Sequence, residues 1–457
     1  MTSKPTDQTI AGPKPASFKP GGPLTGRITV PGDKSISHRS LILSALAIGK
    51  SQISGLLEGE DVLATAAALR AMGAKIEKRD SSWTVNGVGV GGLMQPETAI
   101  DLGNSGTSVR LLMGLVASHD LSVTFTGDAS LSKRPMGRVI DPLSSMGADF
   151  TARMSSDGKA CLPLTLRGLC PAIPIEYRLP VASAQVKSAI LLAGLNAPGV
   201  TRVIEPVPTR DHSETMLKGF GANLTVETDR DGNRIISLTG EAELSPQKIK
   251  VPGDPSSAAF PVVAALLVPG SDIVVENVGI NPTRAGLFTV LQQMGGDISF
   301  KKKRIVGGEP VADIHVKHSK LTGIDVQADI APSMIDEFPI LFIAAALAEG
   351  TTTTSGLHEL RVKESDRLSQ MAEGLSLLGV DVTEKEDGLV ITGSGGPIPG
   401  GKKKTAIKTA LDHRIAMSFA VAGLMTKTGV AIDDMSPTET SFPGFADLLA
   451  TLQGSAK

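Results

Sequence analysis

The sequence predicts an α/β protein of two domains, built from six β-α-β-α-β-β units with three units in each domain. Three observations predict this architecture. The stretch VPGDKS at 30–35 returns as VPGDPSS at 251–257. The length of 457 residues and a hydrophobic content of 41% suffice for two or three cores. A helix end followed by a strand also recurs, marked by Gly73, Gly147, Gly221, Gly295 and Gly379.

Every unit shows the same order of elements. An extended segment leads into an apolar helix, and a second strand is followed by an amphipathic helix that ends at the glycine. Units one to five then add a hairpin, for which Asp231 and Gly232 supply turn chemistry in unit three. The first strands are expected over 26–30, 98–102, 175–179, 247–251, 324–329 and 405–409, the apolar helices over 40–49, 109–117, 187–195, 260–268, 338–348 and 415–425, and the second strands over 51–56, 122–127, 201–206, 272–278, 351–357 and 430–435.

The sixth unit stops at the end of the chain without a hairpin, while the chain begins with a spare strand at 23–30. The simplest solution is that this strand completes the domain of the last units, and that units one to three are inserted within it. Pro and Gly at both VPGD sites suit hinges between the domains. The predicted boundaries are a flexible tail over 1–22, domain A over 23–32 and 254–457, domain B over 33–253, and hinges near 31–33 and 250–254.

Composition argues against several classes of function. The net charge of −2, with a single Trp and a single Tyr, gives no general field or stacking surface for nucleic acid. The longest apolar stretch, 338–348, is too short to cross a membrane, and the N-terminus lacks a secretory signal. Cys161 and Cys170 have neither zinc nor disulfide spacing. We therefore expect a cytoplasmic protein that binds no nucleic acid, membrane or metal.

Cations and hydroxyls gather at the predicted helix starts. Both helices of each unit should begin at the carboxyl ends of its strands, where ligands tend to bind, and helix N-termini attract anions. The cleft between the domains should therefore bind a small polyanion such as a phosphate or carboxylate. The side chains in question are Lys34, Ser35, Arg39, Asn104, Ser105, Thr107, Arg110, Lys133, Arg134, Ser183, Gln185, Lys187, Arg210, Arg284, Lys363, Arg367 and Arg414.

Two carboxylates stand among these cations. Asp336 and Glu364 lie at the two equivalent loops of the fifth unit, where they would weaken anion binding unless they move protons. We interpret them as an acid/base pair. The alternative is that both are ordinary acids of a first helical turn. His38 and His413, which flank the cation clusters, are as suited to positioning a neighbour as to catalysis.

Other motifs are weak. GVGVGG at 87–92 is not followed by a helix, so it does not indicate a dinucleotide site. HVKH at 315–318 falls on an expected strand and lacks a third metal ligand. The runs KKKR at 301–304 and GKKKT at 401–405 are expected to be solvated turns of hairpins.

Several long motifs, in the same order, resemble those of the EPSP synthase (3-phosphoshikimate 1-carboxyvinyltransferase) family, and the bacterial class II form most closely. The resemblance covers about 22–450 and implies the inside-out α/β fold of enolpyruvyl transferases. It implies transfer of the enolpyruvyl group of phosphoenolpyruvate to the 5-hydroxyl of shikimate 3-phosphate, without a cofactor, in aromatic amino-acid biosynthesis. The motifs are PGDKSISHR, GNSGTS, GDASLSKRPMGR, SAQVKSA, RVKESDR and LDHRIAMS.

The resemblance also implies roles for individual residues. Asp336 would take the hydroxyl proton, Glu364 would handle the proton at the enol methylene, and Lys34 is a further candidate for proton transfer. Shikimate 3-phosphate would contact Lys34, Ser35, Arg39, Ser183, Ala184, Gln185, Arg210, Asp336 and Lys363. Phosphoenolpyruvate would contact Lys34, Gly106, Arg134, Gln185, Arg367 and Arg414.

Some positions depart from the family pattern. Thr440 stands where many members have lysine, Glu359 where Asn is frequent, and Arg210 lies in a stretch that elsewhere carries Tyr and is expected to compensate for it. Gly106 leaves room beside the phosphoenolpyruvate site, where a larger residue gives resistance to glyphosate, so we expect glyphosate to inhibit this protein.

Two alternatives remain at this stage. One is the sister transferase that acts on UDP-N-acetylglucosamine, which relies on a cysteine in a mobile loop, whereas Cys161 and Cys170 are expected in a hairpin. The other is a non-catalytic module that binds anions or RNA ends, for which Asp336 and Glu364 would be unnecessary. We expect a monomer.

Overall fold

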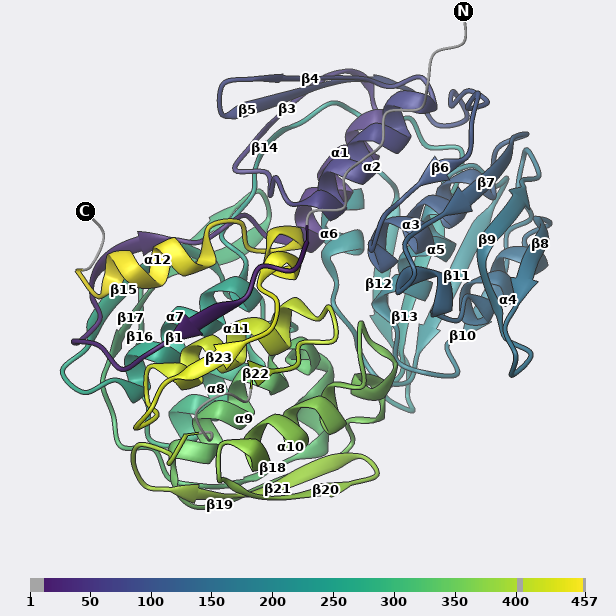
Figure 1. Ribbon diagram of the computed structural model, residues 1–457. Coiled ribbons are helices and arrows are strands. Elements are labelled where there is room, and N and C mark those ends of the chain that lie inside the picture. Colours follow the sequence, from purple (N-terminus) through teal and green to yellow (C-terminus); the bar gives the residue numbers. More distant parts are fainter. Residues whose placement is uncertain (1–11, 401–405, 455–457) are drawn as a thin grey trace, which may run out of the picture.

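The computed structural model describes residues 12–400 and 406–454, and helices form the centre of each of its two lobes (Figure 1). These central helices are apolar on almost all sides, as a helix must be when other elements surround it. Every residue of the helix at Phe338–Leu347 is buried. The predicted apolar segments thus form α1 (Lys34–Leu46), α3 (Gly106–Val116), α5 (Ala184–Gly194), α7 (Pro255–Leu267), α9 (Phe338–Leu347) and α11 (His413–Gly423).

A second set of helices follows the second strand of each unit. The first five end at the predicted glycines, which all have φ between +81° and +99°, a conformation that glycine adopts without strain. The predicted helix ends are confirmed. These helices are α2 (Glu60–Ala71), α4 (Gly137–Ser145), α6 (His212–Gly219), α8 (Gly286–Gln293), α10 (Arg367–Leu377) and α12 (Phe445–Leu452), and short 3₁₀ helices occur at Leu131–Lys133, Ala328–Ser333, Ile335–Glu337, His358–Val362 and Ser436–Thr440.

The sheets lie outside the central helices and share one pairing pattern (Figure 1). The first strand runs parallel to the second, and the second runs antiparallel to the inner strand of the hairpin. This confirms the β-α-β-α-β-β unit. Three sheets are built from consecutive strands: β6 (Ile100–Asp101), β7 (Ser122–Thr126), β9 (Ala160–Arg167) and β8 (Asp149–Met154); β10 (Glu176–Arg178), β11 (Val200–Glu205), β13 (Arg234–Thr239) and β12 (Leu224–Thr228); and β18 (Asp325–Val326), β19 (Glu349–Thr354), β21 (Gly388–Ser394) and β20 (Asp381–Lys385).

Two further sheets exchange their first strands. The strand before α1 pairs in the sheet of unit four, and the strand before α7 pairs in the sheet of unit one. The chain therefore passes from one lobe to the other immediately after each of these strands. In pairing order the sheets are β14 (Lys248–Lys250), β3 (Ile48–Ser54), β5 (Ser82–Val88) and β4 (Lys75–Arg79), and β16 (Asp297–Val306), β17 (Glu309–Lys317), β15 (Asp272–Gly279) and β2 (Thr25–Thr29).

The sixth sheet corrects the prediction of a flexible tail over 1–22. Ala16–Phe18 forms β1, which pairs antiparallel with β23 (Val430–Ile432), and β23 in turn pairs with β22 (Ala406–Ile407). The sixth unit has no hairpin to cover β23, so the N-terminal segment covers it instead, and Phe18 packs against the core. Residues 1–11 lie outside the described residues.

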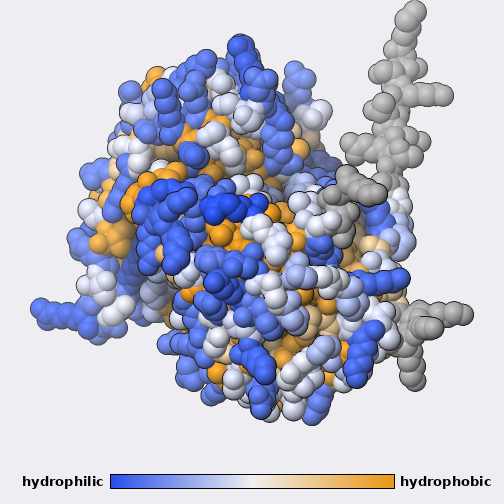
Figure 2. All heavy atoms as spheres, turned by 90° about the vertical axis from the view of Figure 1, so that its left-hand side faces the viewer, coloured by the Kyte–Doolittle hydropathy of each residue, from blue (hydrophilic) through white to orange (hydrophobic). Residues whose placement is uncertain are grey.

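Two separate hydrophobic cores result. One is formed by buried side chains between 36 and 251, and the other by those of 24–30 and 258–452. We call the lobes around them domain B and domain A. On the face drawn in Figure 2, hydrophobic residues lie in separate areas among hydrophilic ones.

The two crossing segments lie side by side. Asp33 N–H donates to the Pro252 carbonyl at 2.8 Å, and Asp254 N–H donates to the Pro31 carbonyl at 2.9 Å. A β-carbon on Gly32 would stand only 2.0 Å from the carbonyl oxygen of Gly55, so glycine is required where the first crossing segment passes the end of β3. Within the described residues, no helix has the length and apolar character that crossing a membrane requires.

Candidate active site

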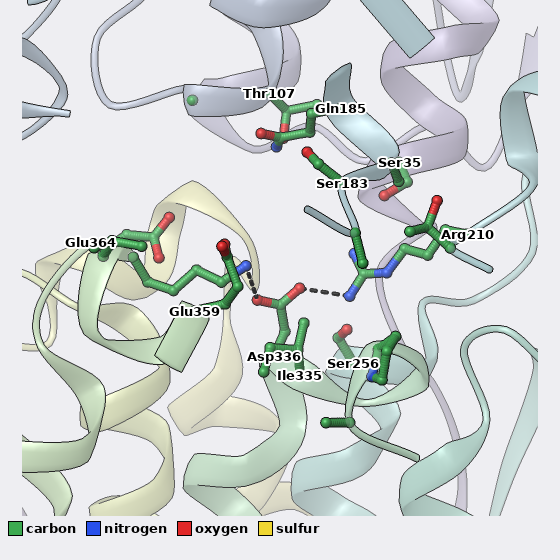
Figure 3. Close-up of a pocket in the computed structure, with 18 of the residues that line it drawn as sticks. Ser35, Thr107, Ser183, Gln185, Arg210, Ser256, Ile335, Asp336, Glu359 and Glu364 are labelled. Atoms are coloured by element: carbon green, nitrogen blue, oxygen red, sulfur yellow. Dashed lines mark hydrogen bonds and ion pairs between the residues drawn. The ribbon is translucent and has the colours of Figure 1, made fainter. Parts of the chain in front are cut away.

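A cavity of about 440 Å³ lies between the two domains, where helix N-termini from both meet (Figure 3). Serine and aspartate side chains cap these helices by accepting from backbone N–H groups of the first turn. Ser183 caps α5 and lies in the cavity wall, while Asp33, Ser105, Asp254 and Asp412 cap α1, α3, α7 and α11. The caps fix the residues that follow them at the cavity surface, and the helix dipoles make the cavity attractive to anions.

The structure brings most of the predicted site residues to this one cavity. Domain B supplies its upper wall in Figure 3, including Ser35, Thr107, Ser183 and Gln185, and domain A supplies the lower wall. The predicted residues that line the cavity are Lys34, Ser35, Gly106, Thr107, Arg110, Arg134, Ser183, Ala184, Gln185, Arg210, Arg284, Asp336, Lys363, Glu364, Arg367 and Arg414.

Five residues predicted at the helix starts do not line the cavity, namely Arg39, Asn104, Ser105, Lys133 and Lys187. Arg39 and Lys187 lie behind the wall instead. Arg39 is buried and donates to the hydroxyls of Ser213 at 2.7 Å and Ser188 at 2.6 Å, and to the Ser35 carbonyl at 3.0 Å. Lys187 is fully buried against two glutamates. The first turn of a helix offers one face to the cavity and another to the core, and sequence spacing does not tell which face a cation takes.

Asp336 is surrounded by cations from both domains. Its Oδ2 lies 2.6 Å from Arg210 Nη2, and its Oδ1 lies 3.2 Å from Arg367 Nη1 and 3.3 Å from Lys363 Nζ (Figure 3). Its side chain is 15% exposed. Glu337, the next residue, faces the core and accepts from the Ser256 hydroxyl, so only the first acid of this pair reaches the cavity.

Glu364 has a similar environment. Its Oε2 lies 2.5 Å from Arg367 Nη2, and its Oε1 lies 3.3 Å from Arg134 Nη1, which belongs to domain B. Arg367 is held in place from behind by the buried Asp412, at 2.8 Å from its Nε. The pair of acids predicted from the sequence therefore shares one arginine, Arg367.

The surrounding cations lower the pKa values of both acids. Burial would raise the pKa of Asp336, but Lys363, Arg210, Arg414 and Arg367 outweigh burial and hold that pKa well below its ordinary value. The pKa of Glu364 is likewise held well below its ordinary value, because Arg367 and Arg134 outweigh burial. Both groups are therefore carboxylates at neutral pH.

Histidine and further carboxylates complete the site. Burial, followed by the charge of Lys34, lowers the pKa of His413 to about 3, so this imidazole is neutral at physiological pH. His38 is buried, with its Nδ1 2.8 Å from Thr65 Oγ1, and it does not line the cavity. Sequence reasoning missed Asp61, whose Oδ2 lies 2.8 Å from Lys34 Nζ. Its position in the first turn of α2, equivalent to the turns that carry the cations, was the available signal.

The remaining motifs lie away from the cavity. The prediction that 301–304 forms a turn is wrong, because these residues belong to strand β16. Their side chains are exposed, as expected. The run 401–405 falls outside the described residues. Cys161 is buried in β9, and Cys170 is exposed beyond the end of that strand. No group of three potential metal ligands occurs among the residues with described positions.

Comparisons with known proteins agree with this geometry. A sequence profile of the family described as EPSP synthase (3-phosphoshikimate 1-carboxyvinyltransferase) matches residues 18–449. A 3-phosphoshikimate 1-carboxyvinyltransferase of Novosphingobium aromaticivorans is 68% identical over 438 residues, which are 95% of this chain and 98% of the relative. A solved EPSP synthase from Acinetobacter baumannii has a TM-score of 0.82 and 49% identity, covering 95% of this chain and 97% of that one. The enolpyruvyl transferase NikO from Streptomyces tendae, at 19% identity and a TM-score of 0.74 over 96% of this chain and 98% of its own, shares the fold.

Proposed function

Because the chain belongs to the EPSP synthase family, we propose that the cavity between its domains is where the enolpyruvyl group of phosphoenolpyruvate passes to the 5-hydroxyl of shikimate 3-phosphate. The reaction yields 5-enolpyruvylshikimate 3-phosphate and phosphate in the shikimate pathway. Membership of this family decides against the sister transferase and against a non-catalytic anion-binding module.

One observation carries the assignment of the chemistry to this cavity. Two carboxylates, Asp336 and Glu364, stand within ion-pair distance of cations from both domains in a single enclosed space. Cations alone would suit any anion-binding protein, whereas acids among them suit a reaction that moves protons beside bound phosphates.

We assign shikimate 3-phosphate to the side of the cavity built mainly by domain B. Arg210 and Lys363 supply positive charge, and the α5 N-terminus supplies the Ser183 hydroxyl and free N–H groups. Arg39 lies behind the cavity wall and positions Ser35, because its guanidinium donates to the backbone carbonyl of Ser35. The full proposed set is Lys34, Ser35, Arg39, Ser183, Ala184, Gln185, Arg210, Asp336 and Lys363.

Phosphoenolpyruvate is assigned to the arginine-rich side. Arg134 approaches from domain B and Arg367 from domain A, so together they can hold a phosphate and a carboxylate in bidentate fashion. Arg110 donates to Gln185 Oε1 at 2.8 Å and orients that amide between the two substrates. The full proposed set is Lys34, Gly106, Arg134, Gln185, Arg367 and Arg414.

Substrate binding changes the partners of the two acids. When a substrate anion takes over Arg134 and Arg367, Glu364 loses its compensating charge and faces new negative charge, so its pKa rises and it can take up a proton. The same exchange at Arg210 and Lys363 makes Asp336 a better base. The cations therefore keep both acids ionised until the substrates arrive.

The proton transfers follow from this exchange. Glu364 protonates the methylene carbon of the enol, while Asp336 accepts the proton of the 5-hydroxyl as its oxygen bonds to the adjacent carbon. In the second half-reaction the tetrahedral adduct loses a proton from the new methyl group back to Glu364, and the carbon–oxygen bond to phosphate breaks. The proton that Asp336 took from the 5-hydroxyl passes to the departing phosphate, which leaves Asp336 a carboxylate again. Lys34 and the arginines stabilise the negative charge on the departing phosphate.

The remaining assignments concern the whole chain. We propose domain boundaries at 23–32 with 254–457 for domain A and at 33–253 for domain B, with hinges at 31–33 and 250–254, which is where the crossing segments pair. We also propose a monomer in the cytoplasm. Two unpaired cysteines, one of them exposed, support a reducing compartment.

Phosphate release from phosphoenolpyruvate tests the proposal. Wild-type protein should release phosphate only when shikimate 3-phosphate is present. Asp336→Asn and Glu364→Gln should each lower kcat by about 10²–10⁴-fold, the range expected for loss of general acid–base catalysis. Glu373→Gln, a neutralised exposed acid on α10, is the matched control and should keep wild-type activity. Release without shikimate 3-phosphate, or activity close to wild type in both variants, would overturn the assignment.

A further inference from the structure

Beside the crossing segments, Arg284 of domain A lies 3.2 Å from Asp33 of domain B. Across the cavity, by contrast, three arginine–carboxylate ion pairs join the domains among the described residues, and all three have the same polarity. In each pair the arginine belongs to domain B and the carboxylate to domain A (Figure 3 labels the three acids). Two of them are inner pairs that involve proposed substrate ligands: Arg210 with Asp336 at 2.6 Å, and Arg134 with Glu364 at 3.3 Å. The third, Arg138 with Glu359, serves neither proposed substrate set.

The third pair lies at the rim of the cavity. Arg138 Nη1 is 3.2 Å from Glu359 Oε1 and 3.3 Å from Oε2, so one nitrogen contacts both oxygens of the carboxylate. The side chains are 35% and 36% exposed, whereas those of the inner pairs are at most 20% exposed. Arg138 stands in the first turn of α4, and Glu359 in the short helix 358–362. We call this pair the rim pair.

The rim pair and the inner pairs respond differently to substrates. Substrate anions compete with Asp336 and Glu364 for the inner arginines, so the inner links between the domains weaken as the site fills. Nothing in the proposed reaction requires Arg138 to leave Glu359. The rim pair can therefore remain formed while substrates occupy the cavity.

We propose that Arg138 and Glu359 act as a latch that holds domains A and B together over bound substrates. The inference rests on the proposed function, because it assumes that both substrates bind between the domains.

A latch has a characteristic kinetic signature. If both substrates bind the closed arrangement, a loss of closed population weakens the apparent affinity for each by the same factor. An exposed ion pair corresponds to at most about a two- to fivefold change in such an equilibrium. A residue that contacts only one substrate would instead affect that substrate alone.

A double-mutant cycle tests the latch in the full-length protein. Arg138→Gln and Glu359→Gln should each raise KM for phosphoenolpyruvate and for shikimate 3-phosphate together, by about two- to fivefold, with kcat within about twofold of wild type. The double variant should be no worse than either single variant, because the same contact is lost in all three.

The matched control is the pair of Lys78 and Glu58. It is comparably exposed, with its atoms 2.6 Å apart, but both residues belong to domain B. The cycle with Lys78→Gln and Glu58→Gln should leave both KM values unchanged. Small-angle scattering supplies a readout independent of activity, since the radius of gyration of the unliganded Arg138→Gln and Glu359→Gln variants should exceed that of wild type.

Three outcomes would overturn the latch. They are unchanged KM values in the single variants, a rise in KM for only one substrate, and effects that multiply in the double variant. Failure of the latch is separable from failure of the proposed function, because the latter is judged on wild type, Asp336→Asn and Glu364→Gln, none of which alters the rim pair.

Discussion

Gly106 shows how a missing side chain shapes the site. It is the first residue of α3, and a β-carbon there would lie 2.7 Å from Arg134 Nη1 and 3.0 Å from Arg110 Nη1. Both contacts are with the ends of flexible side chains, which would have to move. Gly106 thus sets where two cavity arginines rest.

Gly106→Ala should therefore act on the phosphoenolpyruvate side of the cavity. The added methyl group displaces Arg134, so we expect KM for phosphoenolpyruvate to rise by roughly tenfold and KM for shikimate 3-phosphate to stay within twofold. Glyphosate should inhibit wild type, and its inhibition constant should rise more than KM for phosphoenolpyruvate does. Steady-state kinetics with Gly219→Ala as control, where a β-carbon meets open space, measure the effect. Unchanged glyphosate inhibition would contradict it.

The environment of Glu364 predicts that substrate binding is coupled to proton uptake. Its pKa lies well below the ordinary value in the free protein, and substrate anions that engage Arg134 and Arg367 should raise it. Binding should then take up protons, and substrate affinity should increase as the pH falls toward the raised pKa. Calorimetric titrations in buffers of different ionisation enthalpy, in mildly acidic solution, measure this uptake, and Glu364→Gln should reduce it. Equal proton uptake in wild type and Glu364→Gln would contradict the idea that substrate anions take over the arginines that pair with Glu364.

At this scale the sequence predicted the members of the site better than their contacts. The helix starts identified most of the cations that line the cavity, because a common fold unit puts these helix starts at one edge. Their partners come from other elements: Arg134 of domain B meets Glu364 of domain A only once the domains are packed, and Lys34 meets Asp61 only once α1 and α2 pack within domain B. No local pattern encodes such pairs.

At the scale of elements, α5, α6 and β11 are joined by a buried charge cluster. Lys187 Nζ on α5 lies 2.9 Å from Glu205 Oε2 at the end of β11 and 2.8 Å from Glu214 Oε1 on α6. Thr209 donates to the other oxygen of Glu205. The cluster therefore anchors the segment that continues to Arg210 in the cavity.

Removal of the lysine should destabilise domain B strongly. Lys187→Met leaves the buried Glu205 without its cation and leaves Glu214 only Arg234, whose Nη2 lies 3.5 Å away. We expect a loss of about 3–5 kcal/mol in the free energy of unfolding, measured in urea. Burial already raises the pKa of Glu205 in the wild type, and without Lys187 it should rise further. A carboxyl whose folded pKa exceeds its unfolded pKa loses stability as pH rises, so the deficit should be larger at pH 8 than at pH 5.

The control for this change is the triple variant with Lys187→Met, Glu205→Gln and Glu214→Gln. It removes the uncompensated charges and should recover part of the lost stability, with little dependence on pH. A deficit in Lys187→Met that stays the same from pH 5 to pH 8 would show that the charges are not its cause.

Helices were predictable from the sequence, whereas strand pairing was less so. Apolar stretches, caps and terminal glycines are local signals, and they located each helix closely. The sheet partners of β1, β2 and β14 are hundreds of residues away, without a turn to fix the register. The strand at Ala16–Phe18 was therefore missed, because its Pro- and Lys-rich surroundings are typical of a tail.

At the scale of the whole molecule, the two cores share no residue. The core of domain B uses side chains between 36 and 251, and β14 closes its sheet before the chain returns to domain A. The two ends of the inserted part are adjacent, since Gly32 and Gly253 pair. Each domain thus has the packing needed to fold as a unit.

The segment 33–253 expressed alone should therefore fold. We expect a cooperative urea transition and a native-like circular dichroism spectrum, because every buried contact of this core is retained. The shorter segment 33–246 is the control: it lacks β14, leaves the edge of β3 unpaired and should be less stable. A non-cooperative, molten 33–253 would show that domain B depends on domain A.

The pairing of β1 with β23 has a consequence for biosynthesis. Ala16 leaves the ribosome early, but its neighbour in the sheet, Ile432, is made near the end of translation. Domain B can assemble on the nascent chain while the N-terminal strands still wait for their partners. Residues 16–18 are thus made long before they can take their place in the sheet.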